Sequence, residues 1–319
     1  MNKIDHIPHL EDLLILRGTD ALNDIIDVLY YKDSFSIKYD GAPAVLFGTC
    51  PTENKFFVAT KSFFNKTPKI NYNVEDITRN HGKSPELVNK LTYIFPLLED
   101  LFHNDLSVTH QSSIIQGDLL FLGSDLDGTN TFTANTITYK FDSPHRVYYD
   151  IGIALHTHYD TQLKSSTSIS DNVLKTPQLD RSFYAPQTSV SRGRGGDGKL
   201  SSFLYSLVNF NRYAKSFKPD PKNVVLVNKL IRNNEELTIY NLQDIFNNEE
   251  FVILYLKVKA AKELLISMLD RYYGRHGLIK SINDVSCGHE GFVTRLQDNT
   301  PVKLVNRKAF SYANFERHS

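Results

Sequence analysis

The residues of this chain with the clearest chemical potential are lysines and carboxylates inside segments that have the pattern of β-strands. Such side chains are disfavoured in half-buried strands unless they are paired or functional. Spread over separate strands, they suggest one polar groove, in which lysines hold phosphate groups and carboxylates hold a divalent cation. The set comprises Lys38, Asp40, Lys61, Asp118, Asp150, Glu290, Lys303 and Lys308.

The segment around Lys38 shows the pattern most clearly. Over residues 35–40, apolar and polar side chains alternate strictly, which predicts a half-buried strand. Gly41 then permits a turn or a close approach of backbone. A lysine at the end of such a strand can be held against a ligand. An ordinary strand with Lys38 and Asp40 facing water explains these four residues equally simply when they are considered alone.

The elements that must position these side chains follow from periodicity. Residues 35–66 predict an antiparallel meander, with Lys38 on its first strand and Lys61 on its third. Residues 285–310 predict two strands around the turn QDNTP, with Glu290 opening the first strand and Lys303 on the second. Apolar residues recur with helical spacing over 8–31, 85–103 and 201–275.

Composition limits the classes of function. The formal net charge of the 319 residues is zero, so nucleic acid or membrane binding would need a local patch. Two cysteines exclude a disulfide framework and suit a reducing compartment, and no apolar run reaches the length of a membrane span. We therefore expect a cytoplasmic protein without a membrane partner; the oligomeric state stays open.

One local patch is basic. Between residues 190 and 233 the chain has nine Lys or Arg against Asp197 and Asp220, with aromatic residues interleaved. Such a stretch can bind phosphates and stack bases, and a solvated helix face is an equally good interpretation. The candidate nucleic-acid contacts are Arg192, Arg194, Arg212, Lys215 and Lys218.

Six short motifs contain or adjoin these residues. In chain order they are Lys38-Tyr39-Asp40-Gly41, Thr60-Lys61-Ser62, Gln116-Gly117-Asp118-Leu119, Tyr148-Tyr149-Asp150-Ile151, Glu290-Gly291-Phe292-Val293 and Val302-Lys303-Leu304-Val305. The series resembles the KxDG, short basic, GEL, aromatic-aromatic-Asp-Ile, EGxV and final lysine motifs of the covalent nucleotidyltransferase superfamily. That superfamily includes polynucleotide ligases and mRNA capping enzymes. Asp118 stands where the family usually has Glu.

The resemblance implies a fold and a division of the chain. We expect an α+β ligase adenylation domain, with antiparallel sheets flanked by helices, over residues 1–160 and 281–319. Residues 161–280 would form a flexible connector and a mostly helical, basic insertion. No C-terminal OB domain is expected, since 11 residues follow Lys308. RNA ligases often lack that domain, which favours RNA. The pattern also resembles uncharacterised ligase-like proteins of large tailed phages, whose site of action would be the host cytoplasm.

The resemblance also implies a reaction. Lys38 would attack the α-phosphate of ATP, with GTP less favoured, expel pyrophosphate and carry AMP on its side chain. A lysine of ordinary pKa, about 10.4, is a poor nucleophile at neutral pH, so burial or neighbouring positive charge must activate it.

Each site residue has an expected role. Lys38, Asp40 and Lys303 would be catalytic, with Lys303 clamping the α-phosphate. Glu290 and Asp118 would hold Mg²⁺ or Mn²⁺. The nucleotide contacts would be Tyr39, Gly41, Lys61, Asp118, Tyr149, Asp150, Glu290, Lys303 and Lys308.

The acceptor of the nucleotide is open at this stage. RNA 5′-phosphate ends are favoured and nicked DNA is an alternative. Capping-like transfer of GMP, or of AMP to another molecule, is a second hypothesis. A ligase-like protein that binds nucleic acid without catalysis is a third. The presence of Lys38, Glu290 and Lys303 argues against the third, because a pure binding protein needs none of them.

Overall fold

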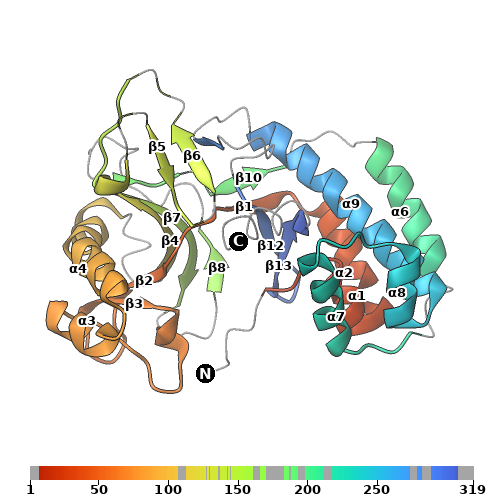
Figure 1. Cartoon of the computed structure of the whole chain (residues 1–319), viewed down its shortest axis with the longest axis horizontal. Coiled ribbons are helices and arrows are strands. Elements are labelled where there is room, and N and C mark those ends of the chain that lie inside the picture. Colours follow the sequence, from red (N-terminus) through yellow and green to blue (C-terminus); the bar gives the residue numbers. More distant parts are fainter. Residues whose placement is uncertain are drawn as a thin grey trace. The chain divides into compact units, whose positions relative to one another are not determined.

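The chain folds as a mixed α+β protein with antiparallel sheets, which confirms the predicted fold class at this level (Figure 1). The structure is a computed structural model. It describes residues 7–106, 113–160 except 127, 129, 136, 142 and 144, then 166–169, 183–192 except 187, 198–211, 217–273, 279–281 and 289–307. None of the described helices combines the length and the apolar character that crossing a membrane requires.

Two compact units make up the molecule. Unit 1 is formed mainly by Tyr39–Ser189, and unit 2 by His6–Lys38, Val190–Gly277 and the chain from Glu290 onward. The helices between residues 198 and 273 therefore belong to the same unit as β1 and the strands that carry Glu290 and Lys303. The division into 1–160 with 281–319 and 161–280 stays a prediction.

Unit 1 is built on an antiparallel sheet with the order β3-β2-β4-β7-β8, to which β9 adds in parallel beside β7. Its strands are β2 (Ala44–Thr49), β3 (Phe56–Thr60), β4 (Ile114–Leu122), β7 (Ile151–Tyr159), β8 (Ser166–Ser168) and β9 (Phe183–Tyr184). A smaller sheet has the order β11-β6-β5 and comprises β5 (Thr131–Thr133), β6 (Thr138–Phe141) and β11 (Ile279–Ser281).

Helices cover one face of the larger sheet of unit 1. They are α3 (Val74–His81) and α4 (Pro85–Asp100), both orange in Figure 1. Ile77 and the apolar stripe of α4, which includes Leu91, Ile94 and Leu98, share one buried cluster with side chains of β2, β3, β4 and β7. Three short helical segments directly follow β3, α4 and β4. They are η3 (Lys61–Phe64), η4 (Leu101–Asp105) and η5 (Gly123–Asp125).

Unit 2 contains a four-stranded sheet with the order β10-β1-β12-β13. Its strands are β1 (Ser34–Lys38), β10 (Ser189–Ser191), β12 (Gly291–Arg295) and β13 (Pro301–Val305). The helical elements of this unit are α1 (Asp12–Arg17), η1 (Gly18–Ala21), α2 (Leu22–Ile26), η2 (Asp27–Tyr31), α6 (Gly198–Asn211), α7 (Lys222–Arg232), α8 (Ile239–Phe246) and α9 (Glu249–Tyr273).

The long helix α9 is the centre of the helical part of unit 2. It contacts α6, α8, η2 and β13. Its buried side chains recur at helical spacing, from Phe251 and Val252 through Tyr255, Val258 and Leu265. The helices predicted over 8–31 and 201–275 and the hairpin predicted over 285–310 are confirmed.

The meander predicted over 35–66 is wrong. Strand β1 pairs with β12 of unit 2, about 250 residues later, whereas β2 and β3 form a hairpin in the larger sheet of unit 1. After β1 the chain does not form a hairpin. It continues into unit 1, where the amide of Ala42 donates to the carbonyl of Leu119 on β4. Lys61 also lies one residue beyond β3, at the start of η3.

Candidate active site

Three neighbouring strands of unit 2 bring together three of the predicted site residues. Lys38 of β1 is opposite Gly291 of β12, and Val293 of β12 is opposite Lys303 of β13. Because side chains alternate along a strand, Lys38 and Lys303 project from the same face of the sheet. The other face is apolar and buried; it carries Phe35, Ile37, Phe292, Val302 and Leu304. The strand predicted over residues 35–40 is therefore confirmed as far as Lys38, where β1 ends.

Lys38 forms an ion pair with Glu290. Its Nζ donates a hydrogen bond to Oε2 of Glu290, and the amide of Glu290 donates to the carbonyl of Lys38 at 2.8 Å. The side chain of Lys38 is 28% exposed and that of Glu290 is 10% exposed. The two most characteristic motifs of the resemblance, KxDG and EGxV, thus meet through both main chain and side chain. The pair holds the lysine at a defined position that solvent can still reach.

The backbone at position 291, directly after Glu290, accepts only glycine. Its φ is +148°, a conformation that L residues with a side chain rarely adopt. A Cβ atom at this position would lie 2.3 Å from the carbonyl oxygen of Leu304 on β13. Strands β12 and β13 can therefore approach each other only with glycine here, and this approach fixes the position of Glu290 relative to Lys303.

Two main-chain hydrogen bonds tie Lys303 to the segment that precedes α1. Its amide donates to the carbonyl of Pro8 at 2.9 Å and its carbonyl accepts from the amide of Leu10 at 3.2 Å, so residues 8–10 run parallel to β13. This pairing places His9 beside Lys303. Burial lowers the pKa of Lys303 below its usual range; the charges of Lys38 and Arg307 act in the same direction, while Glu290 opposes them.

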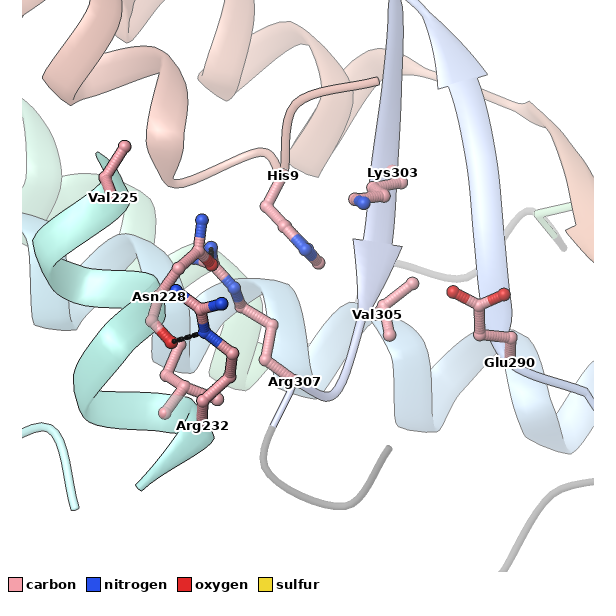
Figure 2. Close-up of a pocket in the computed structure, with 9 residues that line it drawn as sticks. His9, Val225, Asn228, Arg232, Glu290, Lys303, Val305 and Arg307 are labelled. Atoms are coloured by element: carbon pink, nitrogen blue, oxygen red, sulfur yellow. Dashed lines mark hydrogen bonds between the residues drawn. The ribbon is translucent and has the colours of Figure 1, made fainter. Parts of the chain in front are cut away.

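A pocket of about 450 Å³ opens next to Lys303 (Figure 2). Its lining consists of His9, Val225, Asn228, Ile231, Arg232, Glu290, Lys303, Val305 and Arg307. Three of these side chains are cationic and one is anionic. Of these residues, only Glu290 and Lys303 were predicted as site residues from the sequence. His9, Asn228 and Arg307 were not predicted, and Arg232 was counted only within the basic stretch.

A buried ionic network fixes Arg307 at the edge of this pocket. Its guanidinium donates to both carboxylate oxygens of Asp12, at 2.8 and 3.0 Å, and to the side-chain oxygen of Asn228 at 2.6 Å. Lys262 of α9 pairs with Glu11 at 2.7 Å, and both side chains are almost completely buried. Burial alone would lower the pKa of Arg307, but the carboxylates of Asp12 and Glu11 raise it above its usual range. The arginine is therefore a fixed positive charge.

In unit 1, Asp40 serves as an anchor for the turn between β5 and β6. Its carboxylate accepts hydrogen bonds from Asn135 Nδ2 and from the amide of Ile137, both at 3.1 Å. Its own amide donates to the hydroxyl of Tyr139 at 2.9 Å. The predicted catalytic role of Asp40 stays a prediction, and the observed contacts indicate that this carboxylate orients the backbone after Lys38.

Tyr39 and Gly41 flank Asp40 in equally constrained positions. The ring of Tyr39 is buried and lies 6.2 Å from that of Tyr139. A Cβ atom on Gly41 would lie 2.7 Å from the carbonyl oxygen of Leu119 and 2.9 Å from Cβ of Asp118. The glycine of KxDG therefore allows the chain to pass directly over the GDL segment of β4.

Asp118 lies on β4 opposite Ala44 of β2 and Ala154 of β7. Its carboxylate is 3.6 Å from Nε2 of His156, and both side chains are partly exposed. Among the described residues, no three His, Cys, Asp or Glu side chains are arranged to hold a metal ion by themselves. A metal bound to Asp118 or to Glu290 would need further ligands from a substrate or from water.

The remaining nucleotide contacts predicted in unit 1 differ in exposure. Lys61 and Asp150 are exposed. The ring of Tyr149 packs in an aromatic cluster, 5.7 Å from Phe141 and 5.3 Å from Tyr184. Stacking of Tyr149 on a base stays a prediction.

The candidate nucleic-acid residues are described only in part. Arg192 donates from Nη1 to the carbonyls of Leu29 and Tyr30, at 2.8 and 3.1 Å, and so stabilises the end of η2. Lys218 is exposed. Arg194, Arg212, Lys215 and the nucleotide-contact candidate Lys308 lie outside the described residues.

Comparison with known proteins identifies a family for the chain. It belongs to DUF6267, a family of unknown function, which matches residues 2–191 and 210–318. The match includes all six motif segments and most of the helical part of unit 2. No curated protein and no solved structure matches the chain.

Proposed function

We propose that this protein is a covalent nucleotidyltransferase with a ligase-like adenylation fold, which forms a lysyl-AMP on Lys38. The observation that carries the proposal is the arrangement of β1, β12 and β13. Lys38 is paired with Glu290, and Lys303 extends from the same face of the same sheet. These residues were expected to act together from motif order alone, although 252 positions separate Lys38 from Glu290.

The proposed reaction follows from these side chains. Nζ of Lys38 attacks the α-phosphorus of ATP, a P–N bond forms, and the bond from the α-phosphorus to the bridging oxygen of the β-phosphate breaks. Pyrophosphate leaves with the electron pair of that bond. A protonated lysine gives up two protons to solvent in all, one to free the amine for the attack and one from the nitrogen of the new P–N bond. Lys303 neutralises charge on the α-phosphate. In phosphoryl transfer of this kind, positioning and charge neutralisation supply most of the catalysis.

The carboxylate of Glu290 is suited to bind a divalent cation that the phosphates of the substrate bind as well. Mg²⁺ is commonly bound through one or two carboxylates together with substrate phosphates and water, rather than by a cage of protein ligands. A partly exposed carboxylate beside two lysines fits that requirement, and Mg²⁺ or Mn²⁺ bound there would neutralise phosphate charge. Asp118 of unit 1 is the second carboxylate that we assign to metal or ribose.

We propose a nucleic acid as the acceptor, with RNA 5′-phosphate ends favoured over nicked DNA, in a cytoplasmic setting. The support is the excess of positive charge between residues 190 and 233. A polyanionic acceptor would be attracted by such a segment, and its binding would weaken with added salt.

Intact-mass spectrometry tests the reaction. The full chain is incubated with Mg²⁺ and ATP, and in parallel with GTP. We expect one AMP to be added to the wild type and none to Lys38→Ala. Lys32→Ala, which removes a lysine just before β1, is the matched control and should be adenylylated like the wild type. Addition of GMP instead of AMP would contradict the assignment of ATP, and no addition with either nucleotide would contradict the proposed function.

A further inference from the structure

The pocket beside Lys303 has one wall that the nucleotidyltransferase motifs do not supply. Val225, Asn228, Ile231 and Arg232 all belong to α7, within the predicted insertion. The opposite wall carries Glu290 and Lys303, which we assign to the nucleotide. A helix outside the motifs thus completes a cavity that begins at the reacting groups.

The pocket offers cations that are not neutralised within the described part of the chain. There, Nζ of Lys303 and the two terminal nitrogens of Arg232 make no hydrogen bond or ion pair. Only Nε of Arg232 is used, in a long 3.4 Å contact to the carbonyl of Asn228. Arg307 differs from these two, because both of its terminal nitrogens are used in the ion pair with Asp12 and one of them also donates to Asn228. Guanidinium groups present several N–H donors in a plane and match phosphate oxygens well.

His9 is a second, independent indication of a ligand. Its Nδ1 atom is buried and has no hydrogen-bond partner among the described residues. Figure 2 shows its ring between Lys303 and Arg307. An unpaired buried polar atom is costly, so a missing partner is expected there. Burial, then Arg307, Lys303 and Lys262, lower the pKa of His9, which reflects the positive field of its surroundings.

The order of these groups across the sheet indicates which anion the pocket takes. Lys38 lies on β1, Lys303 on β13 and His9 on the segment beside β13, with Arg232 on the helix that closes the pocket. In-line displacement places the attacking and leaving groups on opposite sides of the α-phosphorus. With Lys38 as nucleophile and Lys303 at the α-phosphate, the leaving group points away from Lys38, toward His9 and Arg232.

We propose that this pocket binds the β- and γ-phosphates of the nucleotide and then the pyrophosphate that leaves, through Arg232, Lys303 and His9. The assignment rests on the proposed function, because that function supplies the diphosphate leaving group. A volume of about 450 Å³ accommodates such a group. Helix α7 thereby contributes to a leaving-group site. Of the cations that line the pocket, Lys303 is partly buried and Arg307 is buried, whereas Arg232 is exposed and thus replaceable without disturbing the fold.

Calorimetric titration of inorganic pyrophosphate with Mg²⁺ tests the site without any turnover. We expect Arg232→Ala to bind pyrophosphate roughly 10- to 100-fold more weakly than the wild type, because charged hydrogen bonds are lost. Arg232→Lys should restore part of the affinity. Lys229→Ala, an exposed cation on the same helix outside the pocket, should bind like the wild type. Equal affinity in the wild type and Arg232→Ala would overturn the assignment, as would Arg232-dependent binding of a 5′-phosphorylated RNA by a protein that does not bind pyrophosphate.

The same titration on Lys38→Ala separates this inference from the proposed function. Pyrophosphate binding that depends on Arg232 and persists in Lys38→Ala supports the pocket, even if no nucleotide adduct forms on the wild type. An adduct on Lys38 of the wild type, together with pyrophosphate binding that ignores Arg232, supports the reaction and overturns the pocket. Circular dichroism of each variant shows that its fold is intact.

Discussion

Lys303 is a residue whose buried charge opposes the stability of the fold. It is partly buried, and the charges of Lys38 and Arg307 add to the effect of burial in lowering its pKa. A lowered pKa means that folding disfavours the charged form. The folded state therefore gains stability as pH rises from the lowered pKa of the folded protein to the unfolded pKa of about 10.4. A side chain kept at such a position despite this penalty is expected to have a function.

Replacing Lys303 by methionine should therefore stabilise the protein or leave its stability unchanged, while abolishing adduct formation. Methionine fills a similar volume without the buried charge. The thermal midpoint of Lys303→Met should equal or exceed that of the wild type at neutral pH. The difference between the two midpoints should shrink as pH rises toward the unfolded pKa of the lysine. A variant that is clearly less stable than the wild type, at neutral pH, would show that Lys303 stabilises the fold.

At the scale of elements, the β12–β13 hairpin depends on one glycine. Gly291→Ala places a Cβ 2.3 Å from the carbonyl of Leu304 at a φ of +148°. The backbone strain alone costs about 1–3 kcal/mol, and the clash adds to it. We expect urea denaturation to show a loss of stability of at least this size, together with weaker adduct formation because Glu290 shifts.

Gly128→Ala is the matched control for this substitution. A Cβ atom there would have no neighbour within 4 Å. Its stability should stay within about 0.5 kcal/mol of the wild type, as is usual for surface substitutions. Equal effects of the two substitutions would show that the close approach at Gly291 does not determine the hairpin.

The buried pair of Lys262 and Glu11 joins α9 to the N-terminal segment. Without Lys262, the buried carboxylate of Glu11 keeps only its longer 3.4 Å contact with Arg307, so Lys262→Met should lower the free energy of unfolding by up to about 3–5 kcal/mol. Adding Glu11→Gln should recover much of this loss, because the orphaned carboxylate is removed. Lys259→Met, which breaks the more exposed pair with Glu263 on the same helix, should cost only about 0.2–0.5 kcal/mol. A similar cost for both lysines in chemical denaturation would contradict the importance of the buried network.

At the scale of the whole molecule, local patterns predicted the elements better than their partners. Alternation around Lys38 predicted a strand, and helical spacing predicted the helices between residues 201 and 275. The meander was wrong because the partner of β1 is β12, far away in sequence, and no local pattern encodes that pairing. The joint position of Lys38, Glu290 and Lys303 was expected only because the motif order resembles a known superfamily.

The pocket could not be predicted in the same way. His9, Arg232 and Arg307 come from three segments that only the fold of unit 2 brings together. Arg232 stood among nine basic residues without a feature to distinguish it, and His9 precedes the first helix in a segment with no strand pattern. Its parallel pairing with Lys303 is a tertiary contact. Burial and missing partners, which reveal these residues, are properties of the folded chain.

The most direct test of the central claim is to locate the nucleotide. After incubation with Mg²⁺ and ATP, the protein is digested at neutral or alkaline pH and its peptides are sequenced by tandem mass spectrometry. We expect one AMP, on Lys38 alone, and its removal with formation of ATP when pyrophosphate is added. An AMP on another residue, or an adduct that persists in Lys38→Ala, would contradict it.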